Sequence, residues 1–309
     1  MLERGLVVLV AIVTVGVCVR NGSRTITDAI RSIAKQDFPH EFMEIIFVDD
    51  GSEDDTLSVI QKSTAKIDIP VRIFHTGWQG LGPARNIVVK NAAGKYIVWV
   101  DSDMIIPENH IRMQVEFMEE NSDVGIASGS YGLLEQGSLV AFLDNLAYVA
   151  YRFKSGGHTN LPGTGGSVCR VEAMRQVGGF DDNIRGSGED VDAAYRVRSA
   201  RWLVVRDKAA IFYGRSKETW RGLWKQYYWH GYGAHYSAHK NRGIVSLPMM
   251  SPPLAFLGGI PYGILAYKVV RRKIALLLPF HSVFKSFAWW AGYLKSHSKG
   301  YGHKFYIQA

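Results

Sequence analysis

Two pairs of aspartates follow apolar segments in the first third of the chain. Asp101 and Asp103 lie in the stretch VWVDSDM, and Asp49 and Asp50 lie in the stretch VDDGSEDDT. Asp and Ser favour turns, so a turn explains either pair taken alone. The alternative is a set of carboxylates that binds a cation or a polar ligand.

The spacing of Asp101 and Asp103 favours a metal site. Residues i and i+2 of an extended chain point to the same face. Two hard oxygen ligands on one side, with space for water and phosphate, suit Mg²⁺ or Mn²⁺. Adjacent Asp49 and Asp50 point apart, so one of them can cap the next helix while the other accepts hydrogen bonds from a ligand.

A second set of candidate residues lies between positions 163 and 202. It consists of a glycine-rich stretch, GTGGSVCRVEAMRQVGGFDD, and an acidic one, GSGEDVDAAYRVRSARW. Glycines such as Gly165 and Gly166 let the backbone approach a ligand closely. Glu189 and Asp190 open a predicted helix, where acids also favour the helix dipole. The functional alternative is a general base that takes a proton from an attacking hydroxyl.

The elements that must position these residues alternate between strand and helix signals. Apolar β-branched runs predict strands, and apolar residues at helical spacing predict helices between them. The strands are predicted at 11–19, 44–48, 71–75, 96–100 and 124–128, and the helices near 26–33, 56–65, 83–92 and 109–120. This alternation predicts an α/β fold with a mostly parallel sheet and helices on both faces. Ligands of such sheets bind beyond the carboxyl ends of the strands, where both aspartate pairs should meet.

In order and spacing, four segments resemble glycosyltransferase family 2. Residues 17–56, which begin VCVRNGSRT and end VDDGSEDDT, resemble the opening of that family. The stretch GPARNIVVKNAAGKYIVWVDSDM resembles the approach to its Asp-x-Asp metal motif. GTGGSVCRVEAMRQVGGFDD and GEDVDAAYRVRSARW resemble its acceptor loop and its Glu-Asp motif. The resemblance covers residues 10–203, two thirds of the chain.

The resemblance implies a GT-A fold, which is Rossmann-like, and an inverting sugar transfer from a UDP- or GDP-linked donor. It makes Asp190 the catalytic base, with Glu189 positioning the base or the acceptor. It places Gly165 and Gly166 on the acceptor side. It implies a divalent cation, Mg²⁺ or Mn²⁺, at Asp103 and Asp101. The predicted nucleotide-sugar-binding residues are Val19, Asn21, Asp50, Arg85, Asp101 and Ser102. Arg85 is predicted from its own position, because it lies near a helix N-terminus that could receive a phosphate; the alternative is a solvated or salt-bridging residue.

The chain departs from the family pattern at two places near the expected site. Cys18 replaces the proline common at the end of the first strand. The histidine often found after the Glu-Asp helix is replaced by Tyr213 or Gly214. Either the metal site is weaker than in the family, or its third ligand comes from elsewhere. His230 and His235 are the candidates, although a histidine in an aromatic segment is commonly structural.

Charge and aromatic residues divide the chain into two unlike parts. Residues 201–309 contain 17 Lys and Arg against two acids, a net charge of +15, and 22 of the 37 aromatic residues. Residues 1–200 carry a net charge of −7. We therefore expect a catalytic domain at 1–215 and a basic, aromatic, helical region at 216–309.

The second region has the composition of a segment that associates with a membrane. Residues 243–267 are uncharged and long enough to span a bilayer, but four prolines argue against one straight helix. Basic residues mixed with tryptophans suit an anionic membrane surface. We therefore expect a protein at the cytoplasmic face of a membrane, peripheral or shallowly inserted, with a glycan or lipid-linked acceptor. The alternative is an ordinary pair of helices that covers the core.

Other features limit the remaining function classes. The apolar run at 6–19 is too short to span a bilayer, and two cysteines favour a reducing compartment. A sugar-phosphate nucleotidyltransferase would need a glycine-rich basic signature after the first strand, which VRNGSRT does not supply. A non-catalytic binder of nucleotide sugars or nucleic acid is disfavoured by the acidic first part and the apolar tail, and no nucleic-acid partner is expected.

Overall fold

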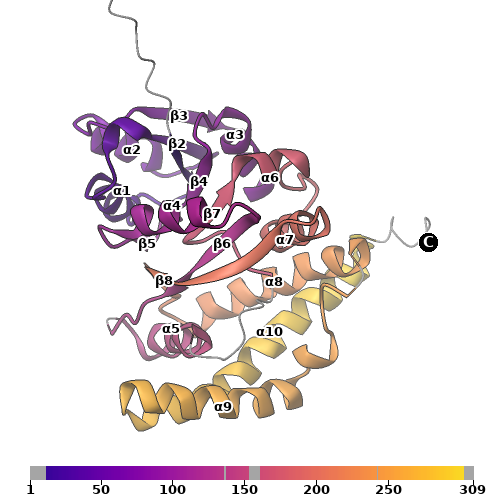
Figure 1. The fold of residues 1–309 in the computed structure, drawn as a ribbon. Helices are drawn as coiled ribbons and strands as arrows, with labels where there is room; N and C mark the ends of the chain where they lie inside the picture. Colours follow the sequence, from indigo (N-terminus) through magenta and orange to yellow (C-terminus); the bar gives the residue numbers. More distant parts are fainter. Residues whose placement is uncertain (1–11, 136, 153–160, 242, 303–309) are drawn as a thin grey trace, which may run out of the picture.

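A computed structural model describes residues 12–135, 137–152, 161–241 and 243–302. The centre of the molecule is one sheet of eight strands with helices on both faces (Figure 1). The strands are β1 (Val13–Val19), β2 (Met43–Asp50), β3 (Val71–Thr76), β4 (Tyr96–Trp99), β5 (Met104–Ile105), β6 (Val124–Tyr131), β7 (Ser167–Arg170) and β8 (Leu203–Gly214). The five strands predicted from sequence are confirmed; β5, β7 and β8 were not predicted.

The sheet is mixed, with the strand order β3-β2-β1-β4-β7-β6-β8-β5. The pairs β1–β2, β1–β4, β2–β3 and β6–β8 are parallel. β7 is antiparallel to both of its neighbours, and β5 is antiparallel to β8. The carboxyl ends of β1, β2 and β4 therefore lie side by side, as the alternation of strands and helices predicted.

Helices cover both faces of the sheet. They are α1 (Ile26–Ala34), α2 (Thr56–Thr64), α3 (Leu81–Asn91), α4 (His110–Glu120), α5 (Leu139–Arg152), α6 (Val171–Gln176), α7 (Glu189–Ser199), α8 (Trp220–Lys240), α9 (Pro252–Val270) and α10 (Leu278–Ser298). One apolar core packs α1, α2 and α4 against one face, and a second packs α3, α6 and α7 against the other. These two cores fix the strand ends relative to α7.

The helices α8, α9 and α10 form a separate layer beside the sheet (Figure 1). α8 packs along α10, and α10 along α9. The connection between β8 and α8 contains the boundary predicted at residue 215. However, Phe142 and Leu146 of α5 share a small apolar core with Ala266 and Leu278. The C-terminal helices are therefore anchored on the first part of the chain, and the division into two domains stays a prediction.

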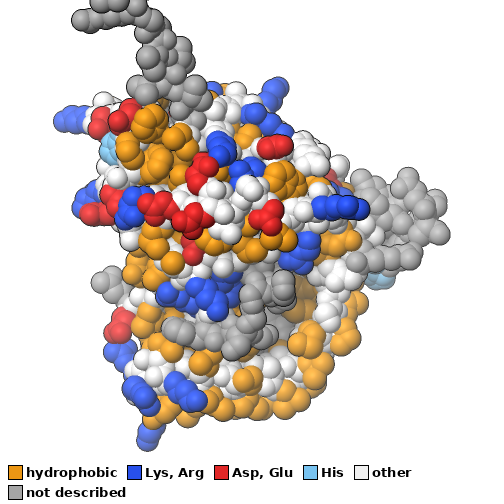
Figure 2. Space-filling view, in the orientation of Figure 1, with side chains coloured by type: hydrophobic (Ala, Val, Ile, Leu, Met, Phe, Trp, Pro, Cys, Tyr) orange, Lys and Arg blue, Asp and Glu red, His pale blue; other side chains and the backbone are white. Residues whose placement is uncertain are grey.

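Two C-terminal segments, 252–270 and 273–298, are long and apolar enough to cross a membrane. Residues 243–267 are not one straight helix, as the prolines predicted, because α9 begins only at Pro252; Pro261 lies inside α9 without ending it. Pro252 and Pro253 lie in the first turn, where a missing N–H costs nothing. Leu257 and Phe280 are 58% and 64% exposed. Hydrophobic side chains gather along the edge of the molecule formed by α9 (Figure 2).

Candidate active site

The two aspartates at the end of β2 have different structural roles. Both are buried. Asp49 accepts hydrogen bonds from Ser52 and from Nδ1 of His75, the latter at 2.8 Å. Asp50 accepts backbone N–H groups of Gln79 and Gly80 at 2.7 and 2.8 Å. Asp50 thus fixes the loop before α3, and its predicted contact with the nucleotide stays a prediction.

The segment after β4 is a turn and not an extended chain. β4 ends at Trp99, and the N–H of Met104 donates to the carbonyl oxygen of Asp101 at 3.0 Å. The i, i+2 argument for Asp101 and Asp103 therefore does not describe the backbone here. The side chains are nevertheless 47% and 37% exposed, and they contact basic residues from different parts of the fold.

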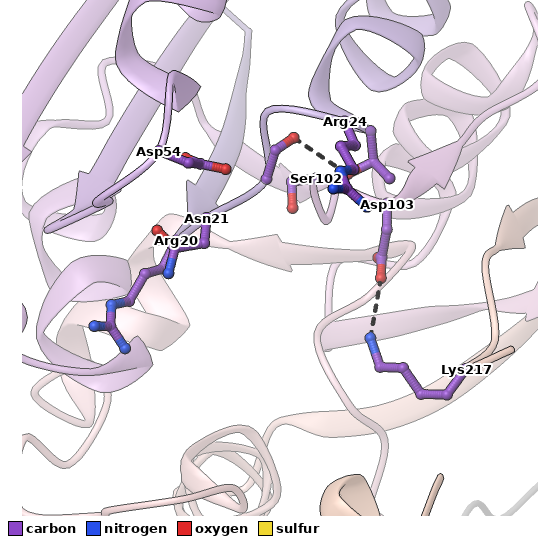
Figure 3. Close-up of a pocket in the computed structure, with 9 residues that line it drawn as sticks. Arg20, Asn21, Arg24, Asp54, Ser102, Asp103 and Lys217 are labelled. Carbon is purple, nitrogen blue, oxygen red and sulfur yellow. Dashed lines mark hydrogen bonds and ion pairs between the residues drawn. The ribbon is translucent and has the colours of Figure 1, made fainter. Parts of the chain in front are cut away.

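Asp103 lies in a pocket of about 520 Å³ at the carboxyl end of β1 (Figure 3). Its carboxylate is 3.8 Å from Nζ of Lys217, a residue in the connection between β8 and α8. The predicted residues Asn21 and Ser102 also line this pocket, whereas Val19 is buried in β1. The other lining residues are Arg20, Gly22, Arg24, Thr25 and Asp54. Three cations, Arg20, Arg24 and Lys217, thus line the same pocket as two carboxylates, Asp54 and Asp103.

A buried ion pair lies next to this pocket. The guanidinium group of Arg85 donates to the carboxylate of Glu189, and both side chains are almost completely buried. Arg85 Nη2 is also 3.8 Å from Oδ1 of Asp101. The rings of Trp99 and Phe180 enclose the guanidinium group. The structure places Arg85 in the interior, so its predicted contact with a phosphate would need a rearrangement.

The carboxyl groups around Arg85 have raised pKa values. Burial, together with the neighbouring charge of Asp190, raises the pKa of Glu189 to about 7, although Arg85 opposes this shift. Loss of water around the carboxyl group, with the charges of Asp103 and Asp190, raises the pKa of Asp101. A cation bound near Asp101 would therefore favour the charged form of its carboxyl group.

Asp190 lies at the start of α7, beside the glycine-rich loop. Its Oδ2 accepts the N–H of Thr164 at 3.4 Å, and its Oδ1 accepts the N–H of Val191 at 2.8 Å. A β-carbon at Gly165 would lie 2.8 Å from Oδ2 of Asp101. The loop is therefore wedged between the two predicted catalytic and metal-binding carboxylates.

Gly166, the second predicted acceptor-side glycine, has a different environment. Its φ is +64°, and a β-carbon there would overlap the ring of Phe212. Its carbonyl oxygen accepts from the N–H of Gly129 and from Nε2 of Gln114. Gly166 thus fixes the loop through contacts with the rest of the protein. Its acceptor-side role stays a prediction.

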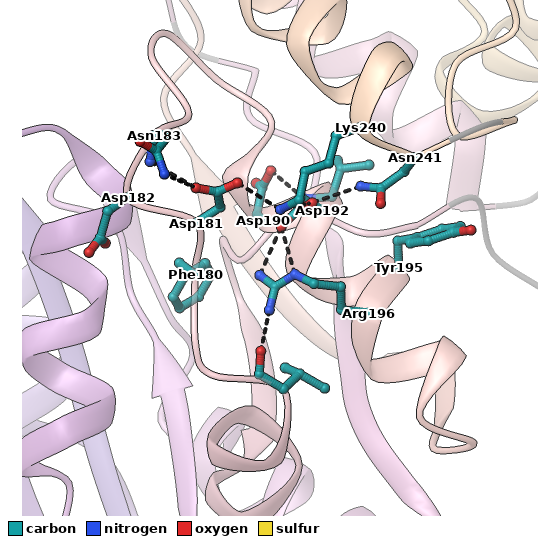
Figure 4. Close-up of polar contacts among 12 residues, drawn as sticks. Phe180, Asp181, Asp182, Asn183, Asp190, Asp192, Tyr195, Arg196, Lys240 and Asn241 are labelled. Carbon is teal, nitrogen blue, oxygen red and sulfur yellow. Dashed lines mark hydrogen bonds and ion pairs between the residues drawn. The ribbon is translucent and has the colours of Figure 1, made fainter. Parts of the chain in front are cut away.

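A polar network fixes α7 relative to α8 (Figure 4). Asp192 of α7 forms ion pairs with Arg196 and with Lys240 of α8, each at 2.8 Å. Lys240 also contacts Asp181 at 2.7 Å. Burial opposes the shift, but hydrogen bonds from Lys240 and Asn183 lower the pKa of Asp181 to about 2. The first turns of α7, which carry Asp190, are therefore tied to α8 through Lys240.

The two histidines proposed as a third metal ligand lie in α8. Burial lowers the pKa of His230, and its environment includes the charge of Asp190. Both ring nitrogens of His235 contact other groups, among them the carbonyl oxygen of Tyr301 and the ring of His297. Among the described residues, the ion-pair partner of Asp103 is Lys217.

The site thus combines predicted and unpredicted residues. The predicted Asp101, Glu189, Asp190 and Gly165 lie close together, next to the pocket that holds Asp103. Lys217 was missed, because its place depends on the return of the chain after the unpredicted strand β8. Arg20 and Arg24 had a signal, since both follow the first strand in VRNGSR.

A GT-A-like sheet with carboxylates at the carboxyl ends of its strands is typical of proteins that use nucleotide sugars. Sequence comparison identifies the same class. The family description "Glycosyl transferase family 2" matches residues 14–174, and "Glycosyl transferase family group 2" matches residues 96–294. The chain belongs to glycosyl transferase family 2.

Curated relatives match parts of the chain. A poly(ribitol-phosphate) beta-N-acetylglucosaminyltransferase, TarS, from Staphylococcus aureus (strain Mu50) is 37% identical over 105 residues, 34% of this chain and 18% of the relative. The Escherichia coli UDP-Glc:alpha-D-GlcNAc-diphosphoundecaprenol beta-1,3-glucosyltransferase WfgD is 31% identical over 121 residues, 39% of this chain and 46% of the relative. The chain thus spans less than half the length of either protein.

Solved structures share the fold. The mannosyltransferase PcManGT from Pyrobaculum calidifontis, in complex with GDP-Man and Mn²⁺, has a TM-score of 0.60 at 17% identity, covering 96% of this chain and 82% of that one. TarS 1-349 from S. aureus, in complex with UDP-GlcNAc, has a TM-score of 0.54 at 19% identity, covering 94% and 92%. These likenesses confirm the predicted GT-A architecture.

Proposed function

We propose that this chain transfers a sugar from a nucleoside-diphosphate sugar, UDP- or GDP-linked, to a hydroxyl or phosphate acceptor with inversion at the anomeric carbon. The observation that carries the proposal is the crevice between the ends of β1 and β4 and the start of α7. It brings Asp101, Asp103 and Asp190 together beside a basic pocket. Family membership and the nucleotide-sugar ligands of structural neighbours support it.

A divalent cation fits the donor side of this crevice. Asp101 and Asp103 offer exposed carboxylate oxygens, the ligand type that Mg²⁺ and Mn²⁺ prefer. A cation bound here would neutralise the charge that develops on the leaving nucleoside diphosphate. Arg20, Arg24 and Lys217 supply further positive charge around the pocket, so the diphosphate binds between these side chains.

The acceptor reacts on the Asp190 side. Asp190 takes the proton from the attacking hydroxyl, and one in-line displacement inverts the anomeric carbon. Glu189 is held by Arg85 in the interior, so it acts as a positioning residue for α7 and Asp190. Gly165 lets the loop backbone approach Asp101 closely, because a β-carbon there would lie 2.8 Å from its Oδ2.

The acceptor is proposed to be lipid-linked and the protein to work at the cytoplasmic face of a membrane. α9 exposes apolar side chains, and the basic residues Lys268, Arg271, Arg272 and Lys273 lie at its end. WfgD, by its name, acts on a diphosphoundecaprenol-linked sugar. A membrane-bound catalytic domain would bring the crevice to such an acceptor.

Calorimetry of UDP and GDP binding, with and without Mn²⁺, tests the donor side. Wild-type protein should bind one of the two nucleotides more tightly when Mn²⁺ is present. Asp103→Ala should lose this metal dependence while its thermal unfolding stays cooperative. Asp68→Ala, which removes an exposed carboxylate next to His40, is the matched control and should bind as wild type. Metal-independent binding by wild type, or unchanged binding by Asp103→Ala, would contradict the metal role.

A further inference from the structure

Three histidines meet at the C-terminal ends of α8 and α10. His235 and His239 are one turn apart in α8, and His297 lies in the last turn of α10. Their ligand nitrogens all lie within 4.8 Å of one another. His235 is buried, His239 is half-buried and His297 is exposed, so the group reaches from the protein interior to its surface.

The hydrogen bonds of His235 fix which nitrogen can bind a metal. Its Nδ1 lies 2.6 Å from the carbonyl oxygen of Tyr301. Because a carbonyl oxygen can only accept, Nδ1 is the donor, and Nε2 of the neutral ring carries the lone pair. A histidine that ligates a metal commonly donates its other N–H to a backbone carbonyl in this way.

Two of the three distances between the nitrogens are close to those of a tetrahedral metal site. Nε2 of His235 is 3.0 Å from Nε2 of His239 and 3.1 Å from Nδ1 of His297. A tetrahedral Zn²⁺ with Zn–N bonds of 2.0–2.1 Å holds its ligand nitrogens roughly 3.3 Å apart. Small side-chain movements would therefore bring all three nitrogens to ligand distance.

We propose that His235, His239 and His297 form a binding site for a Zn²⁺-class transition metal, with the fourth position open to water or another ligand. Imidazole ligands suit Zn²⁺, Co²⁺ and Ni²⁺, whereas Mg²⁺ and Mn²⁺ prefer oxygen. The chain thus has two metal-binding regions with different preferences: oxygens at Asp101 and Asp103, and nitrogens at the histidines.

The histidine site stabilises α8 and α10, which support the loop that leads into α7. Tyr301 donates its hydroxyl to the carbonyl oxygen of Asn183 at 2.7 Å and accepts the N–H of Arg185. α8 packs directly on the same loop, because a β-carbon at Gly233 would overlap the carbonyl oxygen of Ser187. An ion that ties α8 to α10 therefore also fixes the loop before Asp190.

Titration of the metal-free full-length protein with Co²⁺ tests the proposal. Wild type should bind close to one equivalent and show the intense visible absorption of tetrahedral Co²⁺. Zn²⁺ should displace it and raise the unfolding temperature. His239→Ala and His297→Ala should each weaken binding by more than roughly 100-fold, since even outer-shell changes cost up to that much. His40→Ala, a histidine paired with Asp68 elsewhere, should bind as wild type.

Three results would contradict the proposal. No saturable Co²⁺ binding by wild type, an octahedral spectrum, or wild-type affinity in both histidine variants would show a hydrogen-bonded histidine cluster only. His297 is exposed, so its replacement should leave the metal-free protein folded. If this variant does not fold, the Co²⁺ spectrum of the wild type tests the proposal: a tetrahedral spectrum supports the site and its absence contradicts it. Asp103→Ala should keep this absorption, so failure here is distinct from failure of the proposed transferase activity.

Discussion

Arg85 is the central positive charge of the candidate active site. It is almost completely buried, pairs with Glu189 and lies 3.8 Å from Asp101. A buried ion pair costs desolvation, and removing one partner leaves the other charge without compensation. Arg85 is therefore the residue whose removal should affect stability and the position of α7 together.

We predict that Arg85→Met destabilises the protein by about 3–5 kcal/mol, the usual cost of breaking a buried pair. The double variant Arg85→Met/Glu189→Leu should recover much of this loss, because no buried charge remains. Urea unfolding of the wild type and the variants measures the difference. Unfolding of Arg85→Met at the wild-type midpoint would contradict the buried-pair interpretation.

At the scale of elements, glycines let α8 and α10 pack backbone to backbone. A β-carbon at Gly231 of α8 would overlap the carbonyl oxygen of Trp289, and one at Gly292 of α10 would overlap that of Tyr228. These contacts hold the layer that supports the loop before α7. Gly258 of α9, by contrast, has open space around it.

We predict opposite effects of the same substitution at two of these helical glycines. Gly231→Ala should destabilise by at least about 1–3 kcal/mol, because the backbones must separate. Gly258→Ala should be neutral or stabilise by roughly 0.5–1 kcal/mol, since alanine favours a helix. Thermal unfolding under one condition compares the two variants. Equal effects would show that α8 and α10 are not closely packed.

Which elements could be predicted depended on how local their signals are. The strands that end at the crevice are continuous apolar runs, so the sequence predicted them. β8 was missed because Arg206, Asp207 and Lys208 interrupt its apolar residues, and its pairing with β6 shifts in register there. β7 has four residues and depends on partners that are distant in the sequence. The position of Lys217 depends on the pairing of β8, and the burial of Arg85 depends on the packing of α3 against α7; no local pattern contains either of these long-range contacts.

At the scale of the whole molecule, the C-terminal helices form a basic layer with an exposed apolar edge. Four aromatic residues of α10, Phe284, Phe287, Trp289 and Trp290, are from composition alone the side chains expected to insert into a bilayer. In the structure, Trp289 is buried and Phe284 packs on Trp220 and Trp224, so of these four Phe287 is the exposed one. The exposed apolar surface is formed instead by α9 and the start of α10, with side chains such as Leu257, Ile264 and Phe280.

We predict tighter binding to anionic than to neutral vesicles, with salt weakening only part of it. Replacing Arg271, Arg272 and Lys273 with Glu should reduce the affinity at least roughly tenfold, because each basic residue at the surface adds about 1 kcal/mol. The control replaces Lys62, Lys66 and Lys90 with Glu, three exposed lysines on the sheet side. Vesicle co-sedimentation measures both. Equal loss in the two variants, or no binding by wild type, would contradict the membrane surface.

The most direct test of the central claim separates donor binding from turnover at Asp190. Release of nucleoside diphosphate from UDP- and GDP-sugars is measured with Mn²⁺ for the wild type and for Asp190→Asn, and calorimetry measures donor affinity for both. The amide cannot take a proton, so turnover should fall by roughly 10²–10⁴ while donor affinity stays at the wild-type value. Wild-type turnover in Asp190→Asn, or equal loss of binding and turnover, would contradict the account of this crevice as a sugar-transfer site with Asp190 as its base.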